Sequence, residues 1–242
     1  AVANNAYLPS DVIKAYNGKT IEVLDTDAEG RMTLADGLSY LSKNYKTDVL
    51  LDLATLTGSS VRMFGYTCGA LFSNDKNLKN ALENAGDKTN QRLWNLPLWD
   101  IWKDEISSDV ADYKNISMKP FGDCIVAAKF LEQFIENHSS WAHLDIAGVA
   151  FGNVSYAKEK AATGYGVELL TEFLETLEAW ENWTDSNHFK QNKTTSNHIK
   201  QNKQMKHTLD SAISNMPVKG FLDLSEFQIP QGEDLVKAIL GL

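Results

Sequence analysis

The chain has 242 residues, of which 43% are hydrophobic and 23% are charged, and its formal net charge is −9. This length allows a full hydrophobic core in one large domain, or in one domain with an appendage. The acidic balance argues against nonspecific nucleic-acid binding, which needs a basic surface, and no apolar run in the sequence is long enough for a membrane span.

Hydrophobic periodicity predicts strands that alternate with helices. The strands are short apolar or β-branched runs, and the helices carry apolar residues at intervals of three or four. The predicted strands are 20–24, 49–54, 67–73, 92–96 and 141–146, and the predicted helices are 32–46, 76–90, 122–137 and 165–177. Because such alternation is typical of α/β proteins, we expect a three-layer α/β/α fold with a mixed, mostly parallel sheet and an irregular or helical tail.

A dense group of charges follows the first predicted strand. Asp25, Asp27, Glu29 and Arg31 fall within seven residues, and carboxylates this close repel one another unless a cation lies among them. If the backbone is extended here, Asp27 and Glu29 leave from the same face and can chelate Mg²⁺, Mn²⁺ or Zn²⁺. Arg31 can bind an anion or stabilise developing negative charge. A helix N-cap cluster or a solvated turn is the alternative for so short a motif.

The loop at residues 55–59 follows the second, buried strand. In open α/β sheets the functional site lies at the carboxyl ends of the strands, so we expect this loop beside the charged group. Its exposed backbone groups can hold a peptide. A helix N-cap formed by Thr57 or Ser59 is an equally good interpretation of the spacing.

Two later segments have more than one interpretation. Residues 109–121 lack a clean period and predict a long loop that can border a pocket. Trp94, Trp99 and Trp102 are spaced like core or interface aromatics, and ligand stacking is the less favoured alternative. Packing is therefore the expected role of the three tryptophans.

The last predicted strand carries two polar residues on one face. His143 and Asp145 suggest either a metal or catalytic pair, or a hydrogen-bonded structural pair, and the structural pair is favoured. Residues 151–164 are expected to form a loop. In the helix that follows, the residues expected to face inward are Val167, Leu170, Phe173, Leu174 and Leu177.

A decapeptide is repeated in tandem at residues 184–193 and 194–203, with eight of the ten positions identical. The repeat is polar and has few apolar anchors, so a disordered or weakly helical linker is expected. His188 and His198 are interpreted as solvated linker histidines, with metal binding as the alternative. Apolar spacing returns after the repeat, but too sparsely to build an independent core.

Five ordered blocks of the sequence resemble one family. Residues 23–31, Val-Leu-Asp-Thr-Asp-Ala-Glu-Gly-Arg, closely resemble the signature of the leucine aminopeptidase (cytosol aminopeptidase) family, which usually has Asn where Asp25 stands. Further resemblances follow in the family's order at residues 52–58, at 111–112 with Asn115, at 141–148 and at 162–164. The resemblance covers residues 1–177, and the role of Asp25 stays open.

The resemblance implies a metal-dependent aminopeptidase that releases leucine and similar amino-terminal residues from peptides. Two divalent ions, Mn²⁺ or Zn²⁺, serve the complete enzyme, with Asp27 and Glu29 as metal ligands and Arg31 as the catalytic residue that organises the water or an anion. The residues implied in substrate binding are Thr55, Leu56, Thr57, Gly58 and Ala147. The expected partners are peptide substrates and further copies of the chain, a hexamer by family, without nucleic acid or membrane.

Only part of the family's site is expected in this chain. In the family, a lysine and further aspartates before the signature complete the ligand set, and a second lysine assists catalysis. The motifs that carry them, of the Lys-Gly-x-x-Phe-Asp and Asp-Met-Gly-Gly types, do not occur in the sequence. We therefore expect an aminopeptidase fragment that is inactive by itself. The alternative is a catalytically inactive scaffold or binding module derived from that fold.

The expected domain organisation follows from these limits. Residues 1–178 are expected to be the carboxyl-terminal part of a catalytic domain, residues 179–206 a polar repeat linker and residues 207–242 a short tail of unknown role. Cys68 and Cys124 are too few for a disulfide framework and favour a reducing, cytoplasmic setting.

Overall fold

A computed structural model describes residues 6–188 of the chain, with side chains up to residue 177. The chain divides into two compact units, Ala1–Phe173 and Leu174–Leu242. The description below concerns the first unit, because the second is described only over the part of one helix that lies before residue 189. Most of the repeat and the whole expected tail at 207–242 lie outside the described residues.

Four strands form the main sheet, in the order β3, β7, β4, β5. Their bounds are β3 (Leu50–Ala54), β7 (Trp141–Asp145), β4 (Gly69–Ser73) and β5 (Leu93–Asn95). Two of the neighbouring pairs, β3 with β7 and β4 with β5, are parallel, whereas β4 and β7 are antiparallel. The sheet is thus mixed and mostly parallel, as the sequence predicts.

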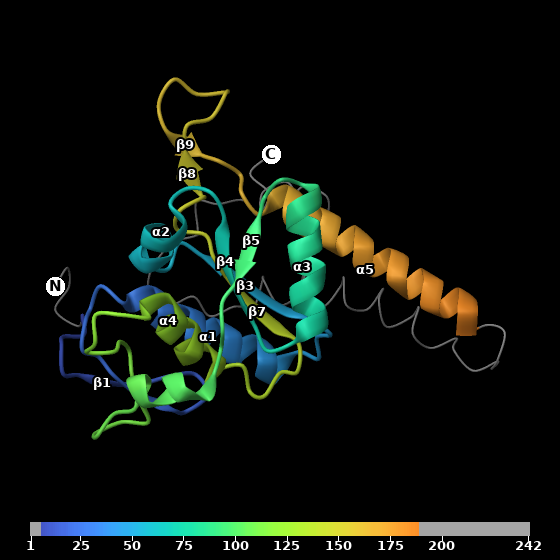
Figure 1. Cartoon of the computed structure of the whole chain (residues 1–242). Helices are drawn as coiled ribbons and strands as arrows, with labels where there is room; N and C mark the ends of the chain where they lie inside the picture. The colour runs from blue at the N-terminus through green and yellow to red at the C-terminus, as the bar shows by residue number, and fades with distance from the viewer. Residues whose placement is uncertain (1–5, 189–242) are drawn as a thin grey trace, which may run out of the picture. The chain divides into compact units, whose positions relative to one another are not determined.

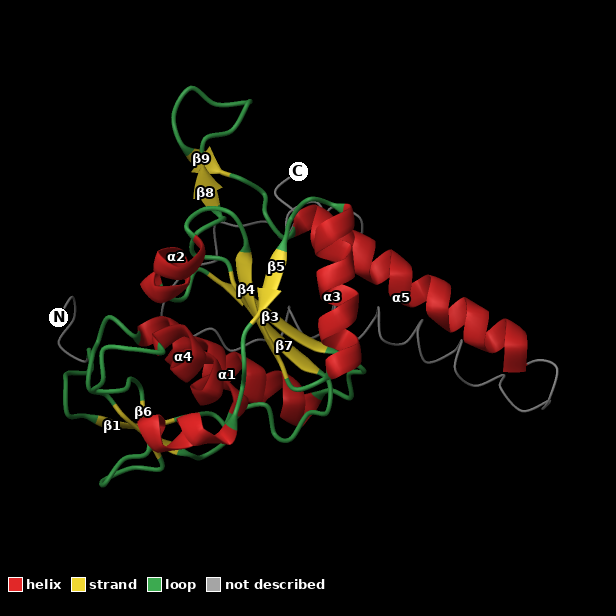
Figure 2. Cartoon of the chain, viewed as in Figure 1, coloured by secondary structure: helices red, strands yellow, loops and turns green. Residues whose placement is uncertain are grey.

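Helices cover both faces of this sheet. The helical elements are α1 (Glu29–Asn44), α2 (Gly58–Phe64), α3 (Lys76–Lys88), the 3-10 helix η1 (Asp100–Ile106), α4 (Asp123–Glu132) and α5 (Val167–His188). Figure 1 shows α1 and α4 on one side of the sheet and α3 on the other, and Figure 2 shows the same layers by element type. The α/β class expected from the alternation of elements is confirmed.

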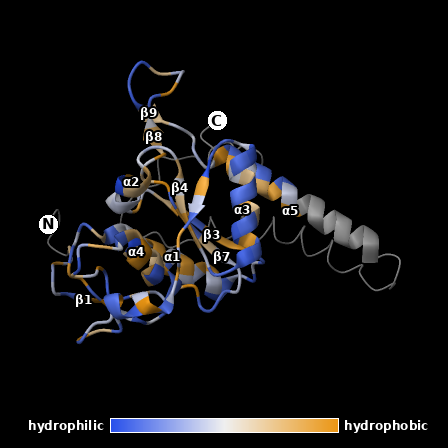
Figure 3. Cartoon of the chain, in the orientation of Figure 1, coloured by the Kyte–Doolittle hydropathy of each residue, from blue (hydrophilic) through white to orange (hydrophobic). Residues whose placement is uncertain are grey.

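The larger core cluster lies between the sheet and the α1–α4 layer. It joins Leu50 of β3 and Trp141 of β7 to apolar residues of both helices. Seven of the ten residues of α4 are buried, so the helix is mostly hydrophobic, whereas α3 presents a hydrophilic outer face (Figure 3). Burial of this kind, rather than helix propensity, holds such short helices in place.

The buried charge on α4 is Lys129, whose side chain is fully buried. Its ammonium donates to the carbonyl oxygen of Leu98 at 3.0 Å, to Asp100 Oδ1 at 3.1 Å and to Glu132 Oε2 at 2.6 Å. All three donors of the ammonium are therefore used. The contacts to Leu98 and Asp100 tie the segment leading into η1 to α4.

Two small sheets stand apart from the main one. β1 (Val12–Lys14), β2 (Thr20–Glu22) and β6 (Tyr113–Lys114) form a three-stranded sheet, and β8 (Phe151–Gly152) pairs with β9 (Ala161–Ala162). The strand that precedes the charged group thus belongs to the small three-stranded sheet. The segment at 151–164, expected to be only a loop, carries the β8–β9 pair.

Several expectations about packing need correction. Trp94 and Trp99 are 63% and 67% exposed, and only Trp102 packs against the core. In α5, Leu174 is exposed although its spacing suggested an inward position, and the buried residues up to position 177 are Leu169 and Phe173. No helix among residues 6–188 is both long and apolar enough to cross a membrane.

Candidate functional site

The chain between β2 and α1 is held in place by one buried amide side chain. Asn115 lies just after β6 and is fully buried. Its Oδ1 accepts the backbone N–H of Leu24 at 2.8 Å and of Asp25 at 3.4 Å, and its Nδ2 donates to the carbonyl oxygen of Asp25 at 2.6 Å. The loop that contains Asn115 therefore fixes where the charged group begins.

A turn, rather than an extended strand, carries the first two carboxylates. Asp25 Oδ1 accepts the backbone N–H of Asp27 at 2.9 Å, which closes an Asx-type turn. Helix α1 begins at Glu29, three residues before the predicted start. The extended geometry considered for Asp27 and Glu29 is therefore wrong, and their common location depends on the turn followed by the helix start.

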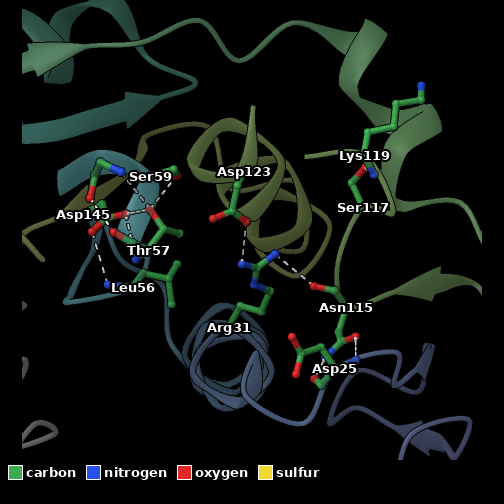
Figure 4. A network of polar contacts seen from close by, with 11 residues as sticks. Asp25, Arg31, Leu56, Thr57, Ser59, Asn115, Ser117, Lys119, Asp123 and Asp145 are labelled. Carbon is green, nitrogen blue, oxygen red and sulfur yellow. Dashed lines mark hydrogen bonds and ion pairs between the residues drawn. The ribbon is translucent and has the colours of Figure 1, made fainter. Parts of the chain in front are cut away.

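Arg31 is buried in the first turn of α1, with 4% of its surface exposed. One terminal nitrogen donates to the carbonyl oxygen of Asn115 at 3.0 Å, and the other pairs with Asp123 Oδ1 at 3.2 Å. Figure 4 shows the guanidinium between these two partners. Its Nε is buried and has no hydrogen-bond partner among the described residues. The site therefore contains a fixed positive charge whose buried Nε–H has no partner among the described residues.

Asp27 and Glu29 are exposed, and the described part of the chain gives neither carboxylate a hydrogen bond or an ion pair. Partial burial, together with the negative charge of Glu29, raises the pKa of Tyr7. Carboxylate oxygens are suitable ligands for Mn²⁺ and Zn²⁺. Asp27 and Glu29 are therefore free to bind a cation, although residues 6–188 contain no group of three or more metal-ligating side chains.

The loop after β3 is held by the carboxylate of Asp145, at the end of β7. Asp145 Oδ1 accepts the N–H of Leu56 and of Ala147, both at 3.2 Å. Oδ2 accepts the N–H of Thr57 at 3.1 Å and the Thr57 hydroxyl at 2.6 Å. Asp145 is 1% exposed, so this charge depends on its four hydrogen bonds for stabilisation.

The hydroxyl of Thr57 is fully used in local contacts. Besides donating to Asp145, it accepts the N–H of Ser60 at 3.3 Å and the hydroxyl of Ser59 at 3.1 Å. A hydroxyl has one donor and two acceptor positions, so none remains for a ligand. Of the two capping residues considered, Thr57 is the N-cap of α2. Any hydrogen bond between Thr57 and a substrate must therefore use its backbone carbonyl, because its N–H also donates to Asp145.

The charged group and the loop after β3 line the same pocket, which has a volume of about 300 Å³. Its lining residues are Asp25, Asp27, Ala28, Glu29, Gly30, Arg31, Thr55, Leu56, Thr57, Gly58, Ile116 and Asp123. Thus the two segments that the sequence analysis expected side by side do lie together, and the loop at 109–121 borders the pocket through Ile116. Ala147 is not among the lining residues and joins this network only through Asp145. The roles assigned to these residues stay predictions.

Sequence reasoning missed Asp123 and misjudged His143. Asp123 begins α4, and no local pattern signals that it pairs with a residue 92 positions earlier. His143 and Asp145 do not pair with each other: His143 Nδ1 lies 2.5 Å from Asp52 Oδ1, whereas Asp145 binds the loop. Asp52 and His143 face each other in the β3–β7 register, which could have suggested the pair if the strand order were known.

The fold and the site together define an α/β protein with an acidic pocket beside the carboxyl end of strand β3. The chain belongs to the cytosol aminopeptidase family, because the model of that family's catalytic domain matches residues 1–171. This confirms the family inferred from the signature.

Curated relatives agree with this assignment. The chain is 49% identical over 170 residues to a probable cytosol aminopeptidase of Chlorobium luteolum, which covers 70% of this chain and 33% of the relative. It is 46% identical over 179 residues to one of Gluconobacter oxydans (74% and 36%) and 47% identical over 176 residues to one of Rickettsia canadensis (72% and 35%). The matched part of the chain thus spans about a third of the length of these relatives.

Proposed function

We propose that this chain supplies two metal-binding carboxylates and one wall of the peptide pocket in a metal-dependent aminopeptidase that releases leucine and similar amino-terminal residues. The observation that carries the proposal is the common pocket of Asp27, Glu29 and Arg31 with the loop at Thr55–Gly58. Family membership supports the reaction class. The substrate class, the complete site and the activity of the whole protein belong to the proposal.

Asp27 and Glu29 are the residues that would hold the metal. Divalent ions at such a site activate water and polarise the scissile carbonyl when they are bound. Both carboxylates are exposed toward the pocket and free of competing hydrogen bonds among the described residues. Two carboxylates hold an ion loosely, so the proposal includes further ligands from a segment that precedes this sequence, to give two Mn²⁺ or Zn²⁺ ions.

Arg31 contributes a positive charge of fixed position. Guanidinium groups carry a permanent positive charge in proteins, and contacts with Asn115 and Asp123 hold this one in place. A preorganised positive charge can orient an anion or stabilise negative charge that develops on the substrate. The backbone groups of Thr55–Gly58 that do not bind Asp145 would hold the peptide in the pocket that Arg31 also lines.

The test is an assay on leucine amide with Mn²⁺ or Zn²⁺, using the 242-residue chain alone and after addition of the amino-terminal part of a related enzyme. The expected result is little or no turnover from the chain alone and activity after complementation. That activity should fall by at least about tenfold in Asp27→Ala and in Glu29→Ala, because even outer-shell partners of a metal contribute about 10- to 100-fold. Complemented activity that ignores both substitutions would rule the proposal out.

A catalytically inactive scaffold or binding module is the second candidate. It is favoured by the absence, within residues 6–188, of any group of three or more metal-ligating side chains. Complementation separates the two candidates, since a scaffold gives no turnover with any amino-terminal partner. Cytoplasmic location and a homo-oligomer, a hexamer by family, complete the proposal for the whole protein.

A further inference from the structure

We infer that Asp145 is a positioning residue for substrate: its carboxylate holds the Leu56–Thr57 backbone in the conformation that forms the pocket wall. Asp145 does not line the pocket. The inference rests on the proposed function for the ligand that it names, an amino-acid amide with a free amino terminus. It predicts that substrate affinity depends on Asp145, whereas metal affinity does not.

The carboxylate of Asp145 accepts an unusually large number of hydrogen bonds. Four hydrogen bonds from three residues, Leu56, Thr57 and Ala147, end on the two oxygens of Asp145. They connect the loop after β3 to the turn after β7, two segments about 90 positions apart in the sequence. A buried carboxylate with this many donors is a strong constraint, because charge-assisted hydrogen bonds are roughly twice as strong as neutral ones.

Asp145 is the acceptor for two successive backbone N–H groups of the loop after β3. The N–H groups of Leu56 and Thr57 both end on Asp145, so no backbone acceptor competes for them. The next residue, Gly58, already belongs to α2. Loss of the carboxylate would thus take the acceptors from one buried and one part-buried N–H group. Asparagine keeps one oxygen but presents an NH₂ donor in place of the other, so at least one of these donors must find a new partner or move.

The proposed metal ligands are positioned by contacts other than those of Asp145. Asp27 and Glu29 are placed by the Asp25 turn and the start of α1, which depend on Asn115 rather than on Asp145. The close-up in Figure 4 shows the Asp145–Thr57 cluster and the Arg31–Asp123–Asn115 cluster as two separate networks. A change at Asp145 should therefore reach the loop and leave the carboxylate pair in place.

Asp52 provides a matched control. Like Asp145 it is a buried carboxylate on a strand of the main sheet, with 8% of its surface exposed. Its oxygens accept from Trp141 Nε1 at 2.9 Å and bind His143 Nδ1 at 2.5 Å, and it has no contact with the loop at Thr55–Gly58 in the described hydrogen-bond network. Asp52→Asn thus perturbs the same sheet without releasing the loop.

The experiment uses the full chain with Asp145→Asn and Asp52→Asn, and it measures three quantities. Amide hydrogen exchange reports on the loop, electron paramagnetic resonance reports the affinity for Mn²⁺, and calorimetry at saturating Mn²⁺ reports the affinity for leucine amide. In Asp145→Asn, exchange at Leu56 and Thr57 should accelerate by about a hundredfold or more while Leu144 stays protected. Leucine amide should bind about tenfold or more weakly, and Mn²⁺ affinity should stay within about twofold.

Each other outcome has a definite meaning. Unchanged exchange at Leu56 and Thr57, unchanged leucine amide binding, or a parallel loss of both affinities would overturn the inference, as would an equal loss in Asp52→Asn. If the unaltered chain does not bind leucine amide but Asp145→Asn still accelerates exchange, the substrate part of the inference is overturned and only the loop-holding role of Asp145 survives. The proposed function is then decided separately, by the complementation assay.

A second pair of variants covers the case in which Asp145→Asn does not fold. Thr57→Val removes the hydroxyl that donates to Asp145 at 2.6 Å, and Thr57→Ser keeps it. Thr57→Val removes one of the four bonds and keeps both N–H bonds. It should therefore show a smaller acceleration of exchange and weaker leucine amide binding, with Mn²⁺ affinity unchanged. Equal behaviour of the two Thr57 variants would overturn the inference.

Discussion

Replacement of Trp141 should be among the most destabilising single changes in the sheet. Trp141 is fully buried at the start of β7, where its ring packs in the core between the sheet and the α1–α4 layer. Its Nε1 also donates to Asp52 Oδ2 at 2.9 Å. The side chain thus contributes through both packing and a hydrogen bond to a buried carboxylate, and two substitutions can separate these contributions.

Trp141→Ala removes both contributions. Large-to-small replacement of a buried aromatic costs about 3 to 5 kcal/mol, and loss of a hydrogen bond to a charged group costs about 1.5 to 3 kcal/mol. The terms overlap, because a cavity can admit water to Asp52, so we expect about 4 to 5 kcal/mol. Trp141→Phe keeps most of the ring volume but loses the donor, and about 1.5 to 3 kcal/mol is expected.

The assay is urea denaturation followed by circular dichroism, with a thermal scan as a check. For a domain of this size, each kcal/mol lowers the midpoint temperature by about 2 to 4 °C. Trp94 on β5 is the matched control: it lies in the same sheet but is 63% exposed, so Trp94→Ala should change stability by no more than about 0.5 kcal/mol. If Trp141→Ala costs less than about 1 kcal/mol, or no more than Trp94→Ala, the packing argument is refuted.

Three further outcomes follow from buried or capped groups. Burial by itself raises the pKa of Asp75, but hydrogen bonds from Ser140, Asn77 and Leu78 together outweigh burial and lower this pKa. The stabilisation is therefore present above the unfolded value of about 3.9 and is lost as the pH falls further; Asp75→Asn should flatten the acid limb of a urea-denaturation pH series, and an unchanged limb would contradict this. Lys129→Met should lower the free energy of unfolding by about 1 to 3 kcal/mol in the same assay. This is less than the loss expected on breaking a fully buried ion pair, because the acidic partners of Lys129 reach solvent. A gain in stability would contradict a stabilising role for the contacts of Lys129 with Leu98, Asp100 and Glu132. Cys124 is 1% exposed, and burial raises the pKa of its thiol. Maleimide should therefore label Cys68 well before Cys124 in the folded protein. Equal labelling rates before unfolding would show that the buried placement of Cys124 is wrong.

The local sequence pattern was sufficient to predict the strands and helices of the main domain and the family. Apolar periodicity predicted each strand of the main sheet and the helices α1, α3, α4 and α5, because a buried face repeats every two residues in a strand and every 3.6 in a helix. The start of α1 was placed three residues late, since Gly30 weakens the helical signal. The structure explains that glycine: a Cβ there would lie 3.3 Å from Leu56 Cδ1, so the helix start approaches the pocket loop closely.

The contacts that assemble the site depend on topology and could not be predicted from the sequence. Arg31 pairs with Asp123 over 92 positions, and His143 pairs with Asp52 over 91. Three of the four bonds on Asp145 come from Leu56 and Thr57, 88 or 89 positions away. Periodicity reports which face of an element is buried, but not which other element covers it. For the same reason Trp94 and Trp99 were expected to pack and are exposed: the sequence determined the family and the carboxylate motif, and only the tertiary structure decided which side chains hold the pocket in place.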